Sequence, residues 1–324
     1  MSNVIVSARN LVKRFPIKKK LWGKPQKFVH AVNGVDLDLV KGQTIGLVGE
    51  SGCGKTTIGR LIVGLDQPNQ GTIYFNGKKF SAFNKQEKRQ YARQVQIVFQ
   101  NPYAALNPRQ RIYHIFREVL KVHQIVSKKD IPSEIQRLLN LVGLSEDAMY
   151  RYPFEFSGGQ QQRICIARAL AVRPQVLVCD EPVSALDVSV QSQVLKLLKQ
   201  LQKQFNLTYL FISHDLSVIY HMCDYVYIMY LGQIMEEGEV EAIFSSARHP
   251  YTQALLSAIP VPDPETKRKR IILEGDVPDP INLPKGCPFF SRCPSKMPIC
   301  QKEKPPTINF SPIHQTRCWL YWDK

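Results

Sequence analysis

Residues Gly49 to Thr57 read GESGCGKTT, a spacing of glycine, lysine and threonine that is typical of loops wrapped around phosphate groups. The apolar run TIGLVG leads into this loop and IGRLIVG follows it, which predicts a buried strand before the loop and a helix after it. Glycines let backbone N–H groups turn towards phosphate oxygens, and the start of the helix adds its positive end. We expect Lys55 to reach the β- and γ-phosphates and Thr56 to offer its hydroxyl to Mg²⁺. The residues predicted to line the phosphate site are Gly49, Glu50, Ser51, Gly52, Cys53, Gly54, Lys55, Thr56 and Thr57.

Polar side chains that suit nucleotide hydrolysis end three further apolar runs. Asp180 ends VLVCD and is expected to hold Mg²⁺, while Glu181 follows at once and is expected to orient or deprotonate the attacking water. His214 ends YLFISH, where an imidazole can hydrogen-bond the γ-phosphate or that water. Gln100 ends VFQ and has an amide able to contact the metal or the water. Each residue alone also fits a surface or structural role, so the interpretation depends on their occurring together with the phosphate loop.

A second candidate phosphate loop is FSGGQQQR, Phe156 to Arg163. A serine and two glycines ahead of a helical run place N–H groups where an anion binds well. One chain does not need two such loops for one nucleotide, so this motif requires a separate explanation.

The pattern of elements predicts an α/β fold with a largely parallel central sheet, because strands alternate with helices along the chain. A helical insertion, from about residue 102 to 158, interrupts this alternation. No internal repeat of solenoid length is found. After Pro260, prolines and cysteines become dense and helical periodicity fades, which indicates a domain edge. The predicted strands are VIVSARNLV, VNGVDLDLV, TIGLVG, GTIYFNG, VQIVFQ, QVLVCDE, LTYLFIS, YVYIMYLG and QIMEEGE.

Length and composition limit the class of protein. A chain of 324 residues exceeds one ordinary domain, and 44% hydrophobic residues suffice for a large core. No apolar run approaches the length that spans a bilayer, and the first residues lack the pattern of a secretory signal, so we expect a cytosolic chain. The net charge of +16 suits nucleic acid, an anionic membrane or a nucleotide site. The basic clusters KKKLWGKPQK and KRKR are interpreted as solvated loops.

Four of the eight cysteines, Cys287, Cys293, Cys300 and Cys318, crowd the end of the chain. In a reducing compartment such clustering favours a metal or cluster over disulfides. Their spacing contains no C-x₂-C pair, which weakens a zinc-ribbon interpretation, whereas four thiolates also suit an iron–sulfur cluster. Spacing alone leaves the metal open, and four unliganded thiols remain an alternative.

In order and spacing, the motifs GESGCGKTT, VFQNP, FSGGQQQR, VLVCDEP, SALD and SHD resemble those of the ATP-binding subunit of an ABC transporter, over about residues 4 to 250. The resemblance implies a P-loop ABC ATPase domain over residues 1–259 that hydrolyses ATP with Mg²⁺. It also implies an antiparallel β subdomain, a helical subdomain at 102–158 and a small Cys/Pro-rich C-terminal extension at 260–324. Phe15 resembles the aromatic residue that stacks on adenine, with Phe28 a weaker candidate.

The same resemblance explains the second loop. In ABC ATPases two subunits pack head to tail, and the serine–glycine signature of each covers the ATP on the other's phosphate loop. By this resemblance Ser157, Gly158, Gly159 and Gln160 would meet the partner's ATP, and Ser184 and Asp187 would lie at the same interface.

The end of the chain narrows the resemblance. RHPYTQALLSAIPVPDP and the cysteine-rich tail resemble ATPase subunits of oligopeptide and dipeptide importers, a group that includes nickel and glutathione systems, and the second of their two ATPases is the closer likeness. The implied partners are a sister ATPase, two transmembrane permeases and an extracytoplasmic solute-binding protein, at the cytoplasmic face of the inner membrane, and no nucleic acid is expected. Related ATPases carry a [4Fe–4S] cluster on similarly arranged cysteines, so a [4Fe–4S] cluster is expected here, with zinc as the alternative. Because these cysteines lie outside every nucleotide motif, we expect the cluster to order the C-terminal segment.

Two other functions remain open. A soluble ABC ATPase acting on nucleic acid or ribosomes would suit the basic charge, but such proteins usually carry two cassettes or a long coiled coil, and neither pattern occurs here. A regulatory subunit that binds ATP without hydrolysis is disfavoured by Glu181, His214 and the intact signature. The transported solute is not identified by the sequence.

Overall fold

The computed structural model describes residues 3–17, 27–259 and 270–322, and their backbone contacts group into two compact units. The first unit comprises Met1–Val40, Thr44–Ser81 and Ser213–Lys324, and the second comprises Lys41–Gln43 and Ala82–Ile212. Most of both basic clusters lies outside the described residues, so their interpretation as solvated loops stays a prediction.

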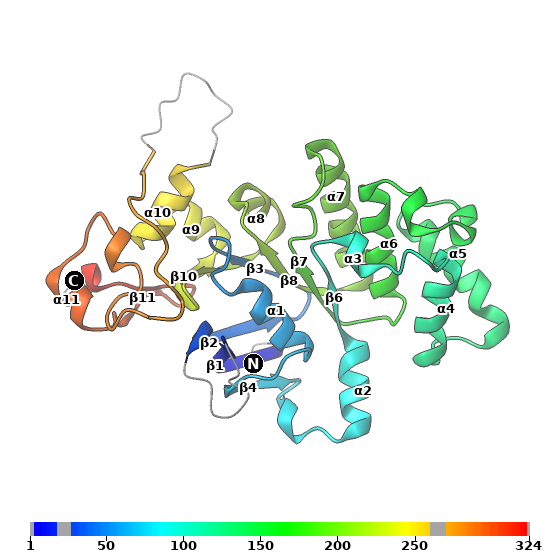
Figure 1. Ribbon diagram of the computed structural model, residues 1–324, viewed down its shortest axis with the longest axis horizontal. Coiled ribbons are helices and arrows are strands. Elements are labelled where there is room, and N and C mark those ends of the chain that lie inside the picture. Colours follow the sequence, from blue (N-terminus) through cyan, green and yellow to red (C-terminus); the bar gives the residue numbers. More distant parts are fainter. Residues whose placement is uncertain (1–2, 18–26, 260–269, 323–324) are drawn as a thin grey trace. The chain divides into compact units, whose positions relative to one another are not determined.

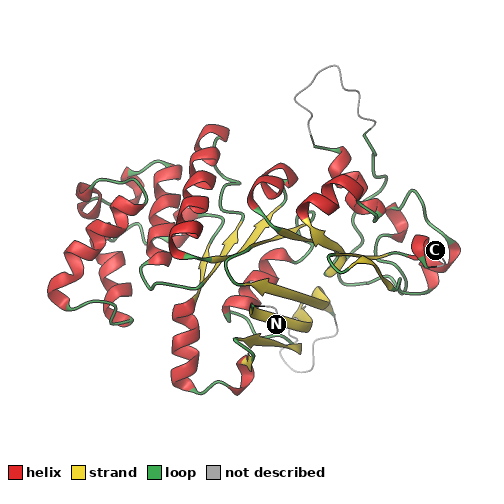
Figure 2. Ribbon diagram, turned by 180° about the vertical axis from the view of Figure 1, so that it is seen from behind, coloured by secondary structure: helices red, strands yellow, loops and turns green. Residues whose placement is uncertain are grey.

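In the first unit, the N-terminal strands form a small antiparallel sheet in the order β2-β1-β4-β5 (Figures 1 and 2). Its strand β2 alternates as the sequence predicts: Val35, Leu37 and Leu39 are buried, and Asp36 between them is exposed. Helix α1 packs against β1 and β2. The bounds of these elements are β1 Val4–Pro16, β2 Phe28–Val40, β4 Gln70–Phe75, β5 Lys78–Lys79 and α1 Lys55–Val63.

The remaining strands of the first unit lie in the order β11-β12-β10-β9-β3. Strand β3 pairs with β9 in parallel, and all five of its residues are buried, as expected for a strand covered on both faces. Strand β10 pairs antiparallel with β9 on one side and with β12 on the other. The bounds are β3 Thr44–Val48, α8 Leu216–Met222, β9 Tyr225–Tyr230, β10 Gln233–Glu239, α9 Val240–Ser246, α10 Pro250–Ser257, α11 Pro298–Lys302, β11 Thr307–Ser311 and β12 His314–Arg317.

The second unit has a parallel sheet of β6, β7 and β8 and most of the helices. Helices α4, α5 and α6 lie side by side, and α3 also packs on α6 (Figure 1). The apolar positions of α4 recur three and four residues apart, and Ile112, Ile115, Phe116 and Leu120 are buried. The bounds are α2 Lys85–Gln94, β6 Val95–Val98, α3 Pro102–Ala105, α4 Ile112–Val122, α5 Ile131–Leu141, α6 Gly158–Leu170, β7 Val176–Asp180, α7 Val188–Phe205 and β8 Thr208–Ser213.

The predicted α/β class is confirmed, with parallel pairing of β3 with β9, β6 with β7 and β7 with β8, and every predicted strand is present within a few residues. Several elements were not predicted, among them the helices α2 and α8 to α11 and the hairpin β11–β12. Helix α2 is polar and mostly exposed, so it lacks an apolar period, although Asn84 and Glu87 form the capping box that marks its start. The hairpin β11–β12 was missed because its outer strand is short and largely exposed.

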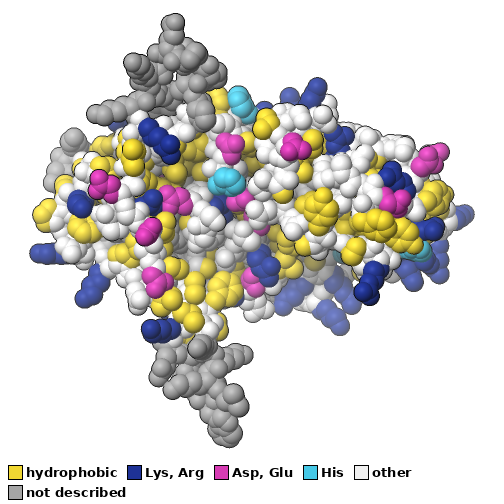
Figure 3. Space-filling model, turned by 45° about the horizontal axis from the view of Figure 1, so that its top comes forward, with side chains coloured by type: hydrophobic (Ala, Val, Ile, Leu, Met, Phe, Trp, Pro, Cys, Tyr) yellow, Lys and Arg dark blue, Asp and Glu magenta, His cyan; other side chains and the backbone are white. Residues whose placement is uncertain are grey.

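On the face drawn in Figure 3, Lys and Arg lie at several places and gather towards the lower right, while Asp and Glu are scattered elsewhere on that face. Among the helices that the structure describes, none combines the length and apolar character needed to cross a bilayer.

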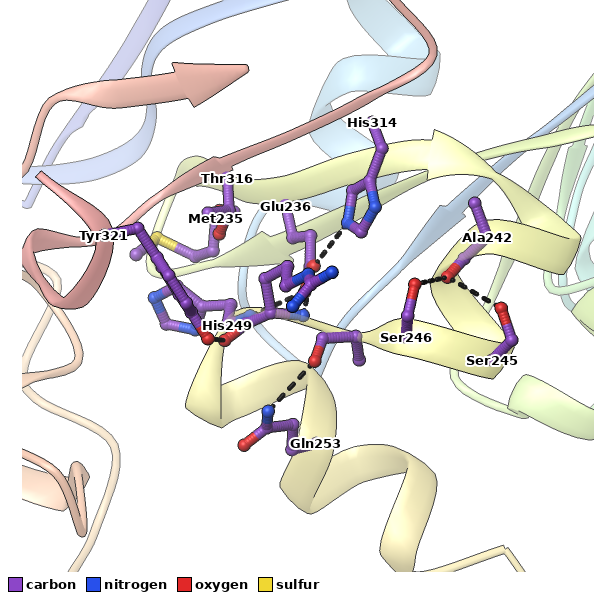
Figure 4. A network of polar contacts seen from close by, with 12 residues as sticks. Met235, Glu236, Ala242, Ser245, Ser246, His249, Gln253, His314, Thr316 and Tyr321 are labelled. Carbon is purple, nitrogen blue, oxygen red and sulfur yellow. Dashed lines mark hydrogen bonds and ion pairs between the residues drawn. The ribbon is translucent and has the colours of Figure 1, made fainter. Parts of the chain in front are cut away.

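A buried carboxylate, Glu236 on β10, links the end of the chain to the start of α10 (Figure 4). Its Oε1 lies 2.8 Å from Nε2 of His314 and accepts the N–H of Arg248 at 2.6 Å, and its Oε2 accepts the N–H of His249 at 3.0 Å. The hydroxyl of Tyr321 adds a bond of 2.9 Å to the carbonyl of Arg248. His314 and Tyr321 are thus held to β10 and to the start of α10 by a polar network, which is stable only when its buried members are paired.

His249 in this network caps α10, because its Nδ1 accepts the N–H of Tyr251 at 3.0 Å. Complete burial lowers the pKa of His249 to about 4, and the Glu236 carboxylate opposes the shift only in part. A proton on Nδ1 would also remove the acceptor that the cap needs.

We predict that His249 makes the unfolding free energy fall as the pH drops from about 6.5 to about 4, by at most about 3 kcal/mol. The sign follows because the unfolded chain takes up this proton in that interval while the folded chain does not. His249→Asn keeps a capping acceptor without this titration, so the stability of the wild type relative to the variant should decline through the interval. Denaturant unfolding at a series of pH values measures the difference, and a constant difference would contradict the prediction.

Candidate nucleotide-binding site

The predicted phosphate loop joins β3 to α1 in the first unit, as its sequence context indicates. Gly54 precedes the helix with φ of 110°, a conformation that glycine adopts without strain. A Cβ at this position would overlap the carbonyl oxygen of Ala31, and one at Gly49 would overlap that of Met229. Both glycines are therefore required because two other segments pass against the loop.

The side chain of Lys55 is buried at the start of α1, and its ammonium donates to the carbonyls of Gly49 at 2.7 Å and Glu50 at 3.0 Å. These two hydrogen bonds hold the ammonium group of Lys55 against the phosphate loop. Thr56 and Ser51 are exposed, whereas Cys53 is buried and donates its backbone N–H to the carbonyl of Glu50 at 3.3 Å. Burial raises the pKa of the Cys53 thiol, which keeps it protonated.

Glu50 in this loop is held from two sides by residues from the far end of the chain. Its N–H donates to the hydroxyl of Tyr251 on α10 at 3.0 Å. Its Oε2 pairs with Nη1 of Arg292 at 2.8 Å, in the C-terminal segment. The stretch RHPYT contains Tyr251, but no role in the site was predicted for Tyr251 or for Arg292, because contacts between residues so distant in sequence carry no local pattern.

The segment around Arg292 is firmly packed. The fully buried Phe289 contacts the rings of Tyr230, Tyr251 and His249, with centroids 5.3 to 5.7 Å away. The tail cysteines lie outside every nucleotide motif in the sequence, yet their segment contacts the phosphate loop through Arg292 and Glu50.

In the second unit, the predicted hydrolytic residues meet at the ends of β6 and β7. These strands are parallel neighbours, so the residues after them share one edge of the sheet. Gln100 donates from Nε2 to Oε2 of Glu181 at 2.9 Å and to the hydroxyl of Ser184 at 3.3 Å. Glu181 has φ of 45°, which is rare for a residue other than glycine and is often found at functional positions. Asp180, which ends β7, is buried.

His214 and Phe15 belong to the first unit, and both are exposed. His214 follows β8 directly, ahead of Asp215, which caps α8 by accepting the N–H groups of Ser217 and Val218. Phe15 lies in β1 opposite Val29, with 37% of its surface exposed and the ammonium of Lys13 5.1 Å from its ring centroid.

The signature FSGGQQQR starts α6, and Ser157 and Gln160 form a capping box. Both side chains are exposed, as are Ser184 and Asp187, which precede α7. Gly159 is buried, and a Cβ there would overlap Cγ1 of Val190 on α7. Glycine at 159 is therefore needed for α6 and α7 to pack together.

The four tail cysteines are near one another. The backbone N–H of Cys287 donates a hydrogen bond to the carbonyl of Cys300 at 2.7 Å, and Cys287, Cys300 and Cys318 are buried. Burial, with a smaller contribution from the neighbouring thiols, raises the pKa of Cys287 to about 12 and that of Cys318 to about 11. None of the eight cysteines is in a disulfide. However, no group of three or more His, Cys, Asp or Glu within the described ranges is arranged to hold a metal, so the expected cluster is not confirmed.

The loop between β3 and α1, together with the α/β architecture, is that of a P-loop nucleotide-binding protein. The family model described as ABC transporter matches residues 32–184, and the model described as oligopeptide/dipeptide transporter, C-terminal region, matches residues 235–300. The chain belongs to the family of ABC transporter ATP-binding proteins of the oligopeptide/dipeptide type.

The similarity to individual proteins covers nearly the whole chain. The oligopeptide transport ATP-binding protein AppF of Bacillus subtilis is 47% identical over 98% of this chain and 97% of its own length. The dipeptide transport ATP-binding protein DppF of Haemophilus influenzae is 48% identical over 93% of this chain and 92% of its own. A dimeric post-hydrolysis state of the ATP-binding cassette MJ0796 bound to ADP and Pi is similar in structure, with a TM-score of 0.63 and 26% identity, over 73% of this chain and 99% of that one.

We predict that Gly159→Ala separates α6 from α7 and lowers the melting temperature, because the added methyl group overlaps Val190. Val190→Ala removes the overlapping carbon, so the double variant should be more stable than Gly159→Ala alone. Thermal unfolding of the three variants tests this prediction. If the double variant loses as much in melting temperature as the two single variants added together, the overlap with Val190 is contradicted.

Proposed function

We propose that this chain is the ATP-hydrolysing subunit that energises import of oligopeptides or dipeptides across the cytoplasmic membrane. The observation that carries the proposal is near full-length similarity to oligopeptide and dipeptide transport ATP-binding proteins. Every motif that ATP hydrolysis requires is present, from the phosphate loop to His214.

Each site residue has a chemical role in this proposal. Lys55 and the N–H groups of residues 49–57 bind the phosphates, and Thr56 and Asp180 hold Mg²⁺ with Gln100. Glu181 orients or deprotonates the attacking water, and His214 hydrogen-bonds the γ-phosphate or that water. The bond from Gln100 to Glu181 supports this assignment, since it orients the carboxylate of the proposed base. Phe15, an exposed aromatic ring, stacks on the adenine.

The chain acts as a head-to-tail dimer with a sister ATPase. Ser157, Gly158, Gly159 and Gln160 cover the ATP on the partner's phosphate loop, and Ser184 and Asp187 lie at the interface. Exposure of Ser157 and Gln160 at a helix N-terminus supports this, because such N–H groups favour an anion. The dimeric cassette MJ0796 bound to ADP and Pi offers a structural parallel.

The further partners are two transmembrane permeases and an extracytoplasmic solute-binding protein, with the chain at the cytoplasmic face of the membrane. We assign residues 1–259 to the ATPase domain and 260–324 to a C-terminal extension. Nickel or glutathione import is the alternative within this class, and the names of the relatives favour peptides. A soluble ATPase on nucleic acid is disfavoured by the match to a transporter's C-terminal region.

We predict that Glu181→Gln binds MgATP normally but hydrolyses it about 10²- to 10⁴-fold more slowly, because it lacks a positioned base. The closed dimer should accumulate. Steady-state hydrolysis by the assembled transporter and size-exclusion chromatography with MgATP measure the two effects. Glu274→Gln, which changes an exposed carboxylate, is the control. Near-normal turnover in Glu181→Gln would rule out this role.

The tail cysteines are proposed to hold a [4Fe–4S] cluster. Four thiols gathered in one folded segment, three of them buried, support the donor chemistry, although their arrangement is not that of a preformed site. A bound cluster would crosslink the C-terminal segment, and no step of hydrolysis is assigned to it.

Protein purified without oxygen is expected to be brown and to contain iron and sulfide in cluster proportions. Replacement of Cys287, Cys293, Cys300 or Cys318 by serine removes a soft ligand and should lower the iron content, whereas Cys223→Ser should not. Stoichiometric zinc would support the alternative metal, and metal-free protein would leave the thiols unliganded.

A further inference from the structure

We infer that Arg292 is a positioning residue of the nucleotide site, which pairs with Glu50 and so prevents the carboxylate of the phosphate loop from repelling the nucleotide. This rests on the proposed ATP-binding function and extends it to a residue of the C-terminal segment. Arg292 acts through Glu50 and has no assigned contact with the nucleotide.

The location of Glu50 makes its charge important. Its carbonyl oxygen accepts from Nζ of Lys55 at 3.0 Å, so this residue contacts the ammonium that reaches for the phosphates. ATP carries several negative charges into the loop, and a carboxylate on the same loop opposes them unless a cation neutralises it. Arg292 is that cation, with its Nη1 2.8 Å from Oε2 of Glu50.

The ion pair of Arg292 and Glu50 is partly shielded from solvent. The side chain of Arg292 is 10% exposed and that of Glu50 is 26% exposed, so solvent screens the pair less than an ordinary surface ion pair. Hydrogen bonds to Glu50 and Tyr230 outweigh burial and raise the pKa of Arg292, so the guanidinium stays charged at any physiological pH.

The C-terminal segment fixes the guanidinium in place. Arg292 ends the short 3₁₀ turn Phe290–Arg292, next to the buried Phe289, and its guanidinium carbon lies 5.9 Å from the ring centroid of Tyr230. Tyr230 and Tyr251 pack on each other, and Tyr251 also accepts the N–H of Glu50. Tyr230 and Tyr251 therefore position both Arg292 and the backbone of Glu50. Glu50 is the residue whose charge Arg292 neutralises.

If Arg292 neutralises Glu50, single and double variants of these two residues in the full-length chain should differ in their Kd for MgATP. Arg292→Gln leaves Glu50 unpaired and should raise the Kd for MgATP by about 3- to 30-fold. Glu50→Gln removes the repulsive charge and should bind MgATP at least as tightly as the wild type. The double variant has neither charge, so it should recover most of the affinity that Arg292→Gln loses. Arg292→Lys keeps a cation, so its Kd for MgATP is expected to be close to that of the wild type.

Equilibrium binding of MgATP to each purified chain is the measurement, with melting temperatures recorded for every variant. Lys296→Gln is the matched control, because it removes an exposed cation from the same segment and should leave the Kd unchanged. If Glu50→Gln weakens binding as much as Arg292→Gln, or the double variant is as weak as Arg292→Gln, the pair is only a mechanical support and the inference fails. An unchanged Kd in Arg292→Gln also overturns it.

Failure of the proposed function gives a different result. A wild-type chain that binds no MgATP, and does not differ from Lys55→Ala, would overturn ATP binding itself. If Arg292→Gln does not fold, the comparison of Glu50→Gln with the wild type still decides between repulsion and support.

Discussion

The phosphate loop takes its shape from the backbone segments that lie against it. Ala31 in β2 and Met229 in β9 present carbonyl oxygens at the positions that a Cβ on Gly54 and on Gly49 would occupy. Because neither segment can withdraw without breaking its own strand pairing, the loop follows a fixed path, and Lys55 is buried against its carbonyls. The precision of the site thus comes from packing in the first unit as much as from the motif itself.

The buried polar groups of this unit form a connected arrangement. Glu236 satisfies two backbone N–H groups and His314, and one of those N–H groups belongs to His249, which caps the helix that carries Tyr251. Tyr251 in turn bonds to the loop at Glu50. A chain of direct contacts therefore runs from β12 to the phosphate loop, in addition to the ion pair of Arg292.

Sequence patterns were informative where the physical cause is local. The strand–loop–helix context of GESGCGKTT and the buried run before Asp180 predicted their elements correctly, because each depends on neighbouring residues. Glu181 and Gln100 were predicted as site residues, although only the pairing of β6 with β7 reveals that they touch. Tyr251 and Arg292 could not be found in this way, since their relation to Glu50 depends on tertiary packing. The hairpin β11–β12 was missed because β11 is exposed, and because the polar residues of β12 are buried only through their pairing with β10.

The contact between Glu50 and Arg292 joins residues 242 positions apart, which has a consequence for synthesis of the chain. At about 5 to 20 residues per second, a ribosome makes Arg292 roughly 12 to 48 seconds after Glu50. During that time every nucleotide motif of the cassette can emerge while the loop still carries an unbalanced carboxylate. A contact between residues so far apart in sequence forms late in folding. The loop therefore acquires its final electrostatic environment only when translation is nearly complete. A product of premature termination before Arg292 would retain all six motifs and lack this counter-charge.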